Sequence, residues 1–247
     1  MKECEVIYVA EDLYNRTINA KQNGEWTEND LKLETELYKE LNALDPKFHF
    51  YWHMQLRPSC FTAKDKGIVP IFKKYIGRFD NIGLTSICLK CLGVPKLYDA
   101  TEICIQWYYK CKNDVNSDLL ASVVNSIYAI KDPRYVKEYL EIIKDDKYLN
   151  LYVSFIIELL GKFKVKEALP RIIELLDCDK LLIVVSAIKA LGYYGEPNNI
   201  CYLLGFLDHE ESNIMNQAAR SIKRMGGLVE KKQISKRKYH FIYQGLK

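Results

Sequence analysis

The amino-acid sequence predicts an all-α fold, in which about five helix pairs stack into a right-handed α-solenoid behind a helical N-terminal cap. Two observations lead to this prediction: similar segments recur at a nearly constant spacing, and residues that end helices follow most of them. One helix pair cannot bury its own apolar face, so the repeated pairs are expected to share a continuous core.

The repeated segments align on one aliphatic residue in each. In Ile157–Gly161 and Ile188–Gly192, for example, this residue is the Leu that precedes the final Gly. The aligned residues lie 35, 33, 31 and 31 positions apart, and they are Leu92, Ile127, Leu160, Leu191 and Ile222. Such a period is typical of arrays built from short helix pairs.

Each repeated segment is expected to form the second helix of its pair. Glycine or proline follows closely, as in Gly195-Glu196-Pro197 and Lys131-Asp132-Pro133, and these residues end helices. Beyond the break, apolar residues return with helical spacing, for example over residues 172–176 and 203–207. Every unit is therefore expected to contain two helices.

The clearest units resemble a known repeat family. Two runs within residues 166–197 look like short HEAT repeats of the phycobilin-lyase type, with Leu-Pro early in the first helix and Ala-Leu-Gly late in the second. The resemblance is close over residues 165–226 and looser over 67–164. An Arg that is common early in the family's second helix is replaced by Val184 and Met215. Such repeats occur in scaffolds, adaptors, immunity proteins and a few enzymes, so the resemblance implies an architecture rather than a reaction.

These patterns divide the chain into three predicted parts: a helical cap over residues 1–64, HEAT-like repeats over 65–229, and a basic and aromatic cap or tail over 230–247. In the first part, Thr27 and Asp30 have the spacing of a capping box, with Asp in place of the usual Glu, and an amphipathic helix is expected after them. The last part mixes Lys and Arg with aromatic residues, which suits either a docked helix or an ordered tail.

Charge is distributed unevenly along a chain whose net charge is +4. Residues 1–50 contain 6 Lys or Arg against 11 Asp or Glu, whereas residues 220–247 contain 9 against 1. Electrostatic partners are therefore expected to meet the two ends. No apolar run approaches the roughly 20 residues that cross a bilayer, and the first residues lack the pattern of a secretory signal. We therefore expect a cytoplasmic protein with reduced thiols and no membrane partner.

Four of the eight cysteines are close enough in sequence to suggest a zinc site. Cys88 and Cys91 form a Cys-x-x-Cys, and Cys104 and Cys111 follow. All four lie in apolar helical segments rather than in tight turns rich in Gly or Pro. This placement favours buried thiols that act as small hydrophobic side chains, so neither a metal nor a cofactor is predicted.

Histidine patterns for metal catalysis are incomplete. His49 and His53 fall on one helical face, but the Glu of a His-Glu-x-x-His motif is missing. His209 is followed by Glu210, whereas the iron-dependent hydroxylases built from HEAT repeats need several such pairs. No catalytic residue is therefore assigned.

The DNA-alkylation-repair glycosylases are also helical solenoids, and they place aromatic residues and an Asp around a damaged nucleotide. Trp26 and Asp30 have a suitable spacing, but they precede the repeats instead of lying among them. Trp107 has no Asp one turn later. Roles in the core or in a cap are therefore expected for Trp26, Trp52 and Trp107.

One polar residue stands two positions before the aligned aliphatic residue in every repeat. If the second helices pack side by side, about 8–10 Å apart, these residues form a ladder along the inner, concave face. The candidate partner-binding residues are this ladder and two cations near its end: Lys90, Asn125, Glu158, Lys189, Arg220, Lys223 and Arg224. Because Glu158 makes the charge mixed, the ladder favours a protein partner over a phosphate backbone. Ordinary solvated positions are the alternative.

The sequence thus predicts a non-enzymatic protein–protein interaction module, such as a scaffold, an adaptor or an immunity-type binder. The alternative is a nucleic-acid-binding or DNA-alkylation-repair-like HEAT solenoid. Lys231 and Lys232 near Tyr239, Phe241 and Tyr243 have a composition that contacts phosphates and stacks on bases, although a solubilising cap fits as well. A chromophore-handling lyase, which the resemblance also implies, needs an acidic or thiol site that the sequence does not identify.

Overall fold

The structure is a computed structural model that describes residues 26–45, 60–114, 118–233 and 239–246. The chain divides into two compact units, Met1–Asp132 (unit 1) and Pro133–Lys247 (unit 2). Both units consist mostly of helices, as predicted, and unit 2 also contains a two-stranded sheet. The boundary between the units falls inside the region for which continuous repeats were predicted.

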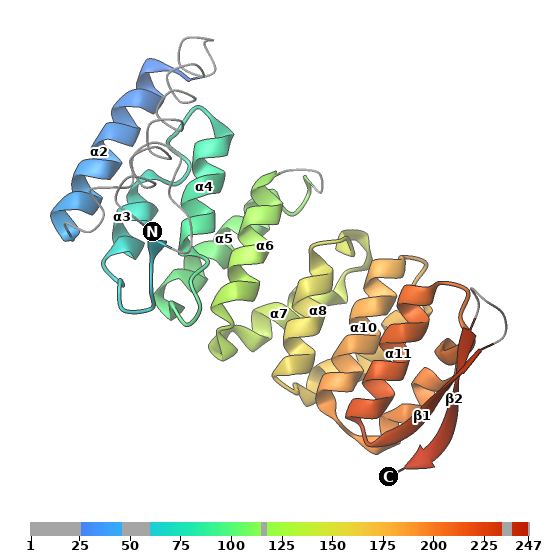
Figure 1. The fold of residues 1–247 in the computed structure, drawn as a ribbon. Coiled ribbons are helices and arrows are strands. Elements are labelled where there is room, and N and C mark those ends of the chain that lie inside the picture. Colours follow the sequence, from blue (N-terminus) through green and yellow to red (C-terminus); the bar gives the residue numbers. More distant parts are fainter. Residues whose placement is uncertain (1–25, 46–59, 115–117, 234–238, 247) are drawn as a thin grey trace. The chain divides into compact units, whose positions relative to one another are not determined.

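Unit 1 is built from helices that pack on their neighbours in sequence or on the next helix but one (Figure 1). Helix α4 packs against α6, α5 packs against α6, and α2 packs against α3. The helices are α2 (Glu28–Leu44), α3 (Ile68–Tyr75), α4 (Ile82–Leu92), α5 (Thr101–Cys111) and α6 (Asp118–Ile130), with a 3-10 turn, η3 (Tyr98–Ala100), before α5.

The start of α2 confirms the predicted capping box. The Asp30 backbone N–H donates to Thr27 Oγ1 at 3.1 Å, and the Thr27 backbone N–H donates to Asp30 Oδ2 at 3.0 Å. The buried Asp30 carboxylate also accepts hydrogen bonds from the backbone N–H groups of Asp80 and Asn81, at 2.8 and 3.1 Å. One carboxylate therefore caps α2 and fixes the loop that leads into α4.

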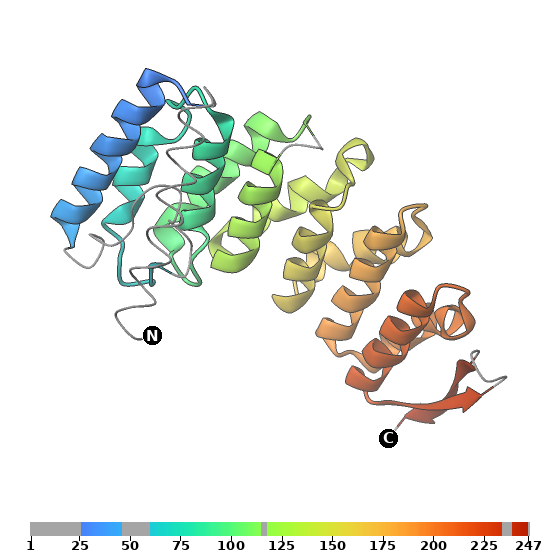
Figure 2. The ribbon, with the colours of Figure 1, turned by 45° about the horizontal axis from the view of Figure 1, so that its top comes forward.

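Unit 2 contains three longer helices that lie side by side in both ribbon views (Figures 1 and 2). These are α8 (Val153–Lys162), α10 (Leu181–Tyr194) and α11 (Ser212–Arg224). The elements that alternate with them are shorter or have 3-10 geometry: η4 (Pro133–Tyr135), α7 (Val136–Lys144), η5 (Asp146–Tyr148), η6 (Lys166–Ala168), α9 (Leu169–Glu174), η7 (Leu175–Asp177) and η8 (Pro197–Asp208). Pro170 and Pro197 stand at the starts of α9 and η8, where the missing N–H costs no hydrogen bond.

The aligned aliphatic residues of the repeats all lie in the core. Leu92, Ile127, Leu160, Leu191 and Ile222 are each 0% exposed. A residue with positive φ stands four positions after each of them, and these residues are Lys96, Lys131, Lys164, Gly195 and Gly226. The predicted period is therefore present in the burial pattern and in the backbone conformation, because each second helix is followed by a left-handed residue at the same place.

Two glycines let neighbouring helices of unit 2 come close together. A Cβ atom on Gly161 of α8 would lie 2.5 Å from Ala190 Cα of α10. A Cβ atom on Gly192 of α10 would lie 2.9 Å from Ser221 Cα of α11. Gly161 and Gly192 are 31 residues apart, as are Ala190 and Ser221. The same close contact is therefore used twice, and it fixes how α8, α10 and α11 align.

The C-terminal part forms a β-hairpin, for which a docked helix or an ordered tail was predicted. Strand β1 (Gly227–Gln233) pairs antiparallel with β2 (Tyr239–Leu246), with a bulge between Leu228 and Val229. The hairpin packs on α11 and η8. Alternating Tyr239, Phe241 and Tyr243 have the period of a strand rather than of a helix, which explains the difference.

Replacing Gly161 with Ala is expected to destabilise unit 2 by about 1–3 kcal/mol, because the added methyl group forces α8 and α10 apart. Chemical denaturation followed by circular dichroism measures the effect. Gly205→Ala is the matched control, because no atom lies within 4 Å of the position that its Cβ would take. Equal stability of the two variants would mean that the close approach of α8 and α10 is not required.

Candidate interaction surface

The structure places the predicted ladder residues on second helices of both units. Lys90 on α4 and Asn125 on α6 are exposed residues of unit 1. Glu158, Lys189 and Arg220 lie on the adjacent helices α8, α10 and α11 of unit 2. Three consecutive members of the ladder thus belong to one compact body, unit 2, which carries the candidate surface.

Glu158 differs from the expectation that it would present a negative charge on the surface. It is 7% exposed, and its Oε1 accepts a hydrogen bond from Lys189 Nζ at 2.8 Å and from Ser186 Oγ at 3.5 Å. The cation comes from the next helix, so the ion pair links α8 to α10. The carboxylate therefore stabilises the contact between the two helices. The sequence predicted a ladder of mixed charge, but the charge that this ladder exposes in unit 2 is positive.

A second row of side chains lies one helical turn after the ladder. It consists of Lys162, Tyr193 and Arg224, which are each 31 residues apart. The Nζ atom of Lys162 lies 5.3 Å from the centroid of the Tyr193 ring, and Arg224 Cζ lies 4.9 Å from it. Sequence reasoning missed Lys162 and Tyr193, although the period that located the ladder also locates this row.

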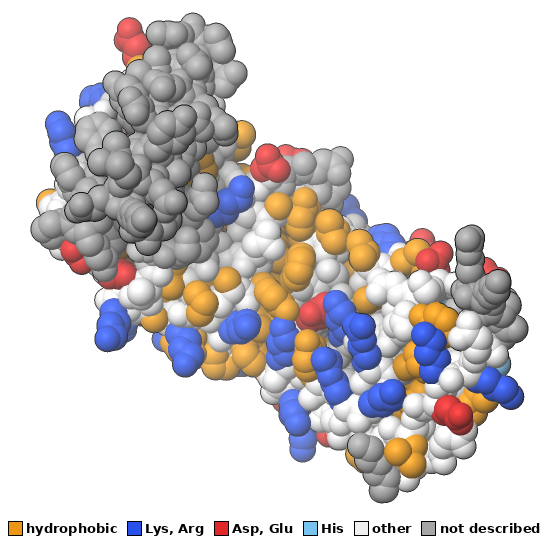
Figure 3. Space-filling model, in the orientation of Figure 1, with side chains coloured by type: hydrophobic (Ala, Val, Ile, Leu, Met, Phe, Trp, Pro, Cys, Tyr) orange, Lys and Arg blue, Asp and Glu red, His pale blue; other side chains and the backbone are white. Residues whose placement is uncertain are grey.

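Cations dominate this side of unit 2, and Figure 3 shows Lys and Arg side chains gathered over α8, α10 and α11. Arg220, Lys223 and Arg224 are exposed, and within the described part of the chain none of the three forms a salt bridge. We call this surface the basic face; it consists of Lys162, Lys189, Tyr193, Arg220, Lys223 and Arg224.

The helix dipole explains part of this arrangement. Lys162 ends α8, and Lys223 and Arg224 lie in the last turn of α11, where cations interact favourably with the carbonyl end of the helix. This effect acts within each helix separately. It does not require Lys162 and Arg224 to approach the same tyrosine ring from two different helices.

Exposed aliphatic side chains accompany the cations in unit 2. Leu182 is 49% exposed, and it lies seven residues, about two turns, before Lys189 on α10. Leu181 is 51% exposed, and Leu151, just before α8, is 49% exposed. The basic side chains at the C-terminal ends of these helices are thus combined with apolar ones near their N-terminal ends.

The basic C-terminal part contributes a further cation beside an aromatic ring. Lys231 Nζ lies 3.5 Å from the centroid of the Tyr239 ring, and the Tyr239 hydroxyl exchanges hydrogen bonds with the Asn216 side chain of α11. An open groove of about 470 Å³ lies next to the hairpin, and it is lined by Leu204, Leu207, Lys232, His240, Phe241, Ile242 and Tyr243. Tyr239 therefore anchors the hairpin to α11.

The cysteines proposed as possible zinc ligands are buried free thiols. Cys88, Cys91, Cys104 and Cys111 are each at most 7% exposed, as expected for small hydrophobic side chains. Burial raises the pKa of Cys88 and of Cys104 to about 12. Within the described ranges, no group of three or more His, Cys, Asp or Glu side chains is arranged to hold a metal ion.

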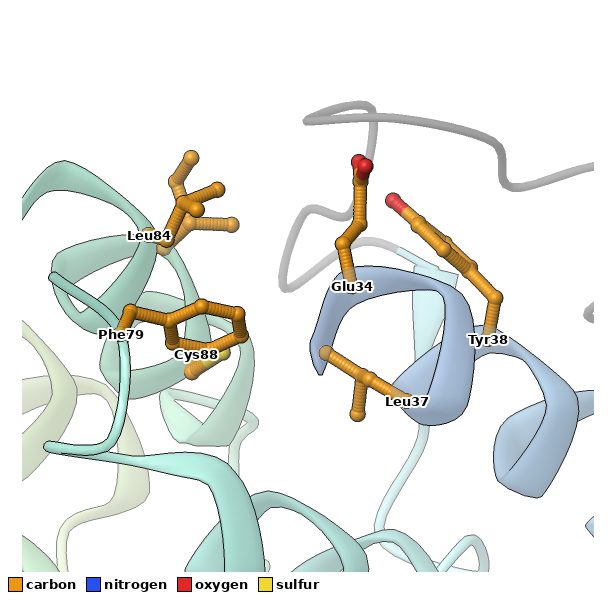
Figure 4. Close-up of a pocket in the computed structure, with 7 residues that line it drawn as sticks. Glu34, Leu37, Tyr38, Phe79, Leu84 and Cys88 are labelled. Atoms are coloured by element: carbon orange, nitrogen blue, oxygen red, sulfur yellow. The ribbon is translucent and has the colours of Figure 1, made fainter. Parts of the chain in front are cut away.

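A small cavity in unit 1 lies between α2 and the segment that contains α4. Its volume is about 10 Å³, which is at the lower limit for one water molecule. Figure 4 shows Leu37 of α2 directed toward Phe79 and Cys88, whereas Glu34 and Tyr38 extend from α2 in a different direction. The cavity is too small to hold a substrate or cofactor.

The remaining predicted candidates have structural roles or lie elsewhere. Trp26 is 7% exposed, and the Asp30 carboxylate is occupied by backbone N–H groups, so the core and cap roles are confirmed for this pair. Trp107 is half-buried beneath Lys110 Nζ at 4.5 Å. His49, Trp52 and His53 lie outside the described residues.

Among the described helices, none is long and apolar enough to cross a membrane.

Comparisons with known proteins do not assign a family. No protein-family profile and no curated protein matches the chain. One similar solved structure is the crystal structure of an engineered protein, which is 13% identical, with a TM-score of 0.49, over 78% of this chain and 96% of that chain.

The buried thiols are expected to resist modification in the folded protein. At pH 8 a thiol reagent should modify the exposed Cys201 and leave Cys88 and Cys104 unmodified until the chain unfolds, because their raised pKa values keep them protonated. Peptide mass spectrometry measures each site, and Cys201→Ser is the control for the exposed thiol. Rapid native modification of Cys88 would contradict the structure.

The same pKa shifts predict a pH dependence of stability. An unfolded Cys ionises near pH 8.5, whereas folded Cys88 ionises near pH 12. The stabilisation from the protonated buried thiol is therefore complete below about pH 8.5 and is lost as the pH rises toward 12. Denaturation midpoints measured between pH 7 and 10 should fall at the alkaline end, and Cys88→Ala should reduce that fall.

Removing the cation beside Glu158 is expected to destabilise unit 2. Lys189→Met removes the cation that donates to the buried Glu158 carboxylate, and we expect a loss of about 1–3 kcal/mol, below the value for a fully buried pair because a third of the Lys189 side chain is exposed. Adding Glu158→Leu should recover most of the lost stability. Arg220→Met, an exposed change in the same row, is the control. Denaturation curves for the wild type, these variants and Glu158→Leu alone measure the coupling.

Proposed function

We propose that this chain is a cytoplasmic, non-enzymatic interaction module that binds an acidic protein through the basic face of unit 2. In this proposal the helix pairs form a right-handed α-solenoid of HEAT-like repeats, and the second helices carry the binding residues. The burial and pairing of Glu158 are the observations that support it most directly. With Glu158 engaged by Lys189, the side chains available on this face are cations, an aromatic ring and polar residues.

The partner is proposed to be acidic because of the charge of this surface. Arg220, Lys223 and Arg224 are exposed and form no salt bridge within the described residues, so they can pair with carboxylates at little cost. Arginine and tyrosine are also enriched at the centres of protein interfaces, where they contribute most of the binding energy.

The partner is proposed to be a protein because apolar side chains accompany the cations. Leu151, Leu181 and Leu182 are about half exposed in the same unit. Aliphatic groups gain free energy by burial against another apolar surface, which a protein supplies. A phosphate backbone would leave them in water.

Nucleic acid is the second candidate, and one observation favours it. Glu158, the carboxylate of the ladder, is 7% exposed, so the exposed charges of the two rows in unit 2 are positive, as expected for a surface that follows a phosphate backbone. In the hairpin, Lys231 beside Tyr239 likewise combines a cation with an aromatic ring, which can contact phosphates and stack on bases. Trp26 and Asp30, in contrast, do not support a repair activity. Trp26 is buried in unit 1, and the buried Asp30 carboxylate accepts hydrogen bonds from backbone N–H groups.

The double variant Arg220→Glu/Arg224→Glu is expected to weaken binding of the partner at least tenfold, which corresponds to about 1.4 kcal/mol. Lys189 is left unchanged because its replacement would disturb Glu158. Affinity purification from the native host, with nuclease present, would identify proteins retained by the wild type and lost by the variant. Titration of the identified protein would then measure both affinities.

The control variant is Lys137→Glu/Lys166→Glu, which makes the same change in net charge on α7 and η6. Both lysines are exposed. Equal loss of partner binding in the two double variants would show that only the overall charge of the chain matters, and it would contradict the assignment of the basic face. Retention that disappears with nuclease, together with affinity for duplex DNA that falls steeply with salt, would favour nucleic acid instead.

A further inference from the structure

The row formed by Lys162, Tyr193 and Arg224 has a geometry that a general basic surface does not need. Helices α8, α10 and α11 each supply one of its side chains. The two cations lie 5.3 and 4.9 Å from the centroid of the same ring, so their charged ends are at most about 10 Å apart. Three helices therefore converge on one small area of surface.

Cations outnumber carboxylates among the residues of the two rows. The two rows, together with Lys223, comprise five cations and one carboxylate, Glu158. That carboxylate is buried and hydrogen-bonded to Lys189, the neighbouring cation on α10. Like charges held close together on a surface repel each other, and an anion bound beside them, at the hydroxyl edge of the Tyr193 ring, relieves the repulsion. The area is thus prepared for an anion.

The chemistry of the three side chains distinguishes between anions. A carboxylate carries one charge and two oxygens, whereas a phosphoryl group carries up to two charges and three strongly accepting oxygens. The Arg224 guanidinium can donate two parallel hydrogen bonds, the Lys162 ammonium adds a point charge, and the Tyr193 hydroxyl adds a neutral donor. Together they match an anion with several oxygens and a double charge.

We infer that the Lys162–Tyr193–Arg224 row binds the phosphoryl group of a phosphorylated side chain on the protein partner. The inference rests on the proposed protein-binding function and makes it more specific. Leu151 and Leu182 are about half exposed and each stands 11 residues before a member of the row, about 16 Å along the helix, so they suit apolar residues about five positions away from such a side chain in an extended segment. A nucleic-acid backbone, by contrast, presents one charge per phosphate and no aliphatic flank.

The first experiment uses inorganic phosphate as the probe. Isothermal titration of the full-length chain at pH 7.5 and constant ionic strength should show saturable binding of phosphate. Arg224→Gln should weaken binding at least tenfold, and Lys162→Gln and Tyr193→Phe should each weaken it severalfold. Lys137→Gln, an exposed change on α7, should leave it unaltered. Absence of saturable binding, or equal weakening by Lys137→Gln, would overturn the inference.

The second experiment identifies the source of the phosphoryl group. A peptide with one phosphoserine and a Leu five positions to either side should bind at least tenfold more tightly than the same peptide with Glu in place of phosphoserine. Its affinity should fall as the pH decreases from 7.5 to 5.5, because the phosphoryl dianion is protonated near pH 6. Equal affinity of the two peptides, or stronger binding of a single-stranded oligonucleotide, would overturn the inference.

These results separate the inference from the proposed function. If the phosphopeptide shows no preference while Arg220→Glu/Arg224→Glu still abolishes retention of a protein partner, the phosphoryl site is wrong and the acidic-protein interface stands. If phosphate binds through Arg224 but no protein is retained through the basic face, the proposed partner is wrong, and the inference fails with it.

Discussion

The close contact between successive second helices is the constraint on which unit 2 depends. Gly161 lies against Ala190, and Gly192 lies against Ser221, with no room for a side chain at either glycine. Because both contacts follow the 31-residue period, α8, α10 and α11 align in register. Side chains at equal positions then lie in straight rows across the helices. The ladder residues and the Lys162–Tyr193–Arg224 row are both consequences of this alignment.

The pairing of Glu158 with Lys189 shows how packing determines what a surface displays. In the sequence, Glu158 stands in the ladder between polar and basic residues and gives it a mixed charge. In the folded unit, its carboxylate points into the contact between α8 and α10 and accepts a hydrogen bond from the neighbouring lysine. This buried and paired carboxylate links α8 to α10 instead of facing solvent, and the remaining exposed charge is positive.

The repeat, the core residues and the helix starts could be predicted from the sequence, because they depend on local patterns. Leu160 and Leu191 are buried as their spacing requires, and the Thr27–Asp30 capping box forms as its sequence predicts. The burial of Glu158 could not be predicted, since it depends on how far α8 lies from α10. The hairpin, in contrast, has a local signal in the sequence: Gly226, with a φ of 89°, ends the helical repeat, and Tyr239, Phe241 and Tyr243 alternate with the period of a strand.

Successive repeats of unit 2 are alike in the core and differ on the surface. At the buried position the chain uses Leu160, Leu191 and Ile222, which differ little because each must fill the same space in the core. At the next row on the surface the equivalent residues are Lys162, Tyr193 and Arg224, which differ in charge, shape and hydrogen-bonding capacity. Lys162 and Tyr193 are half-buried and Arg224 is exposed, so packing constrains this row less than it constrains the core. In the proposed interaction module, the regular core fixes the positions of the Lys162–Tyr193–Arg224 row, and the different side chains of the row supply the chemistry for binding.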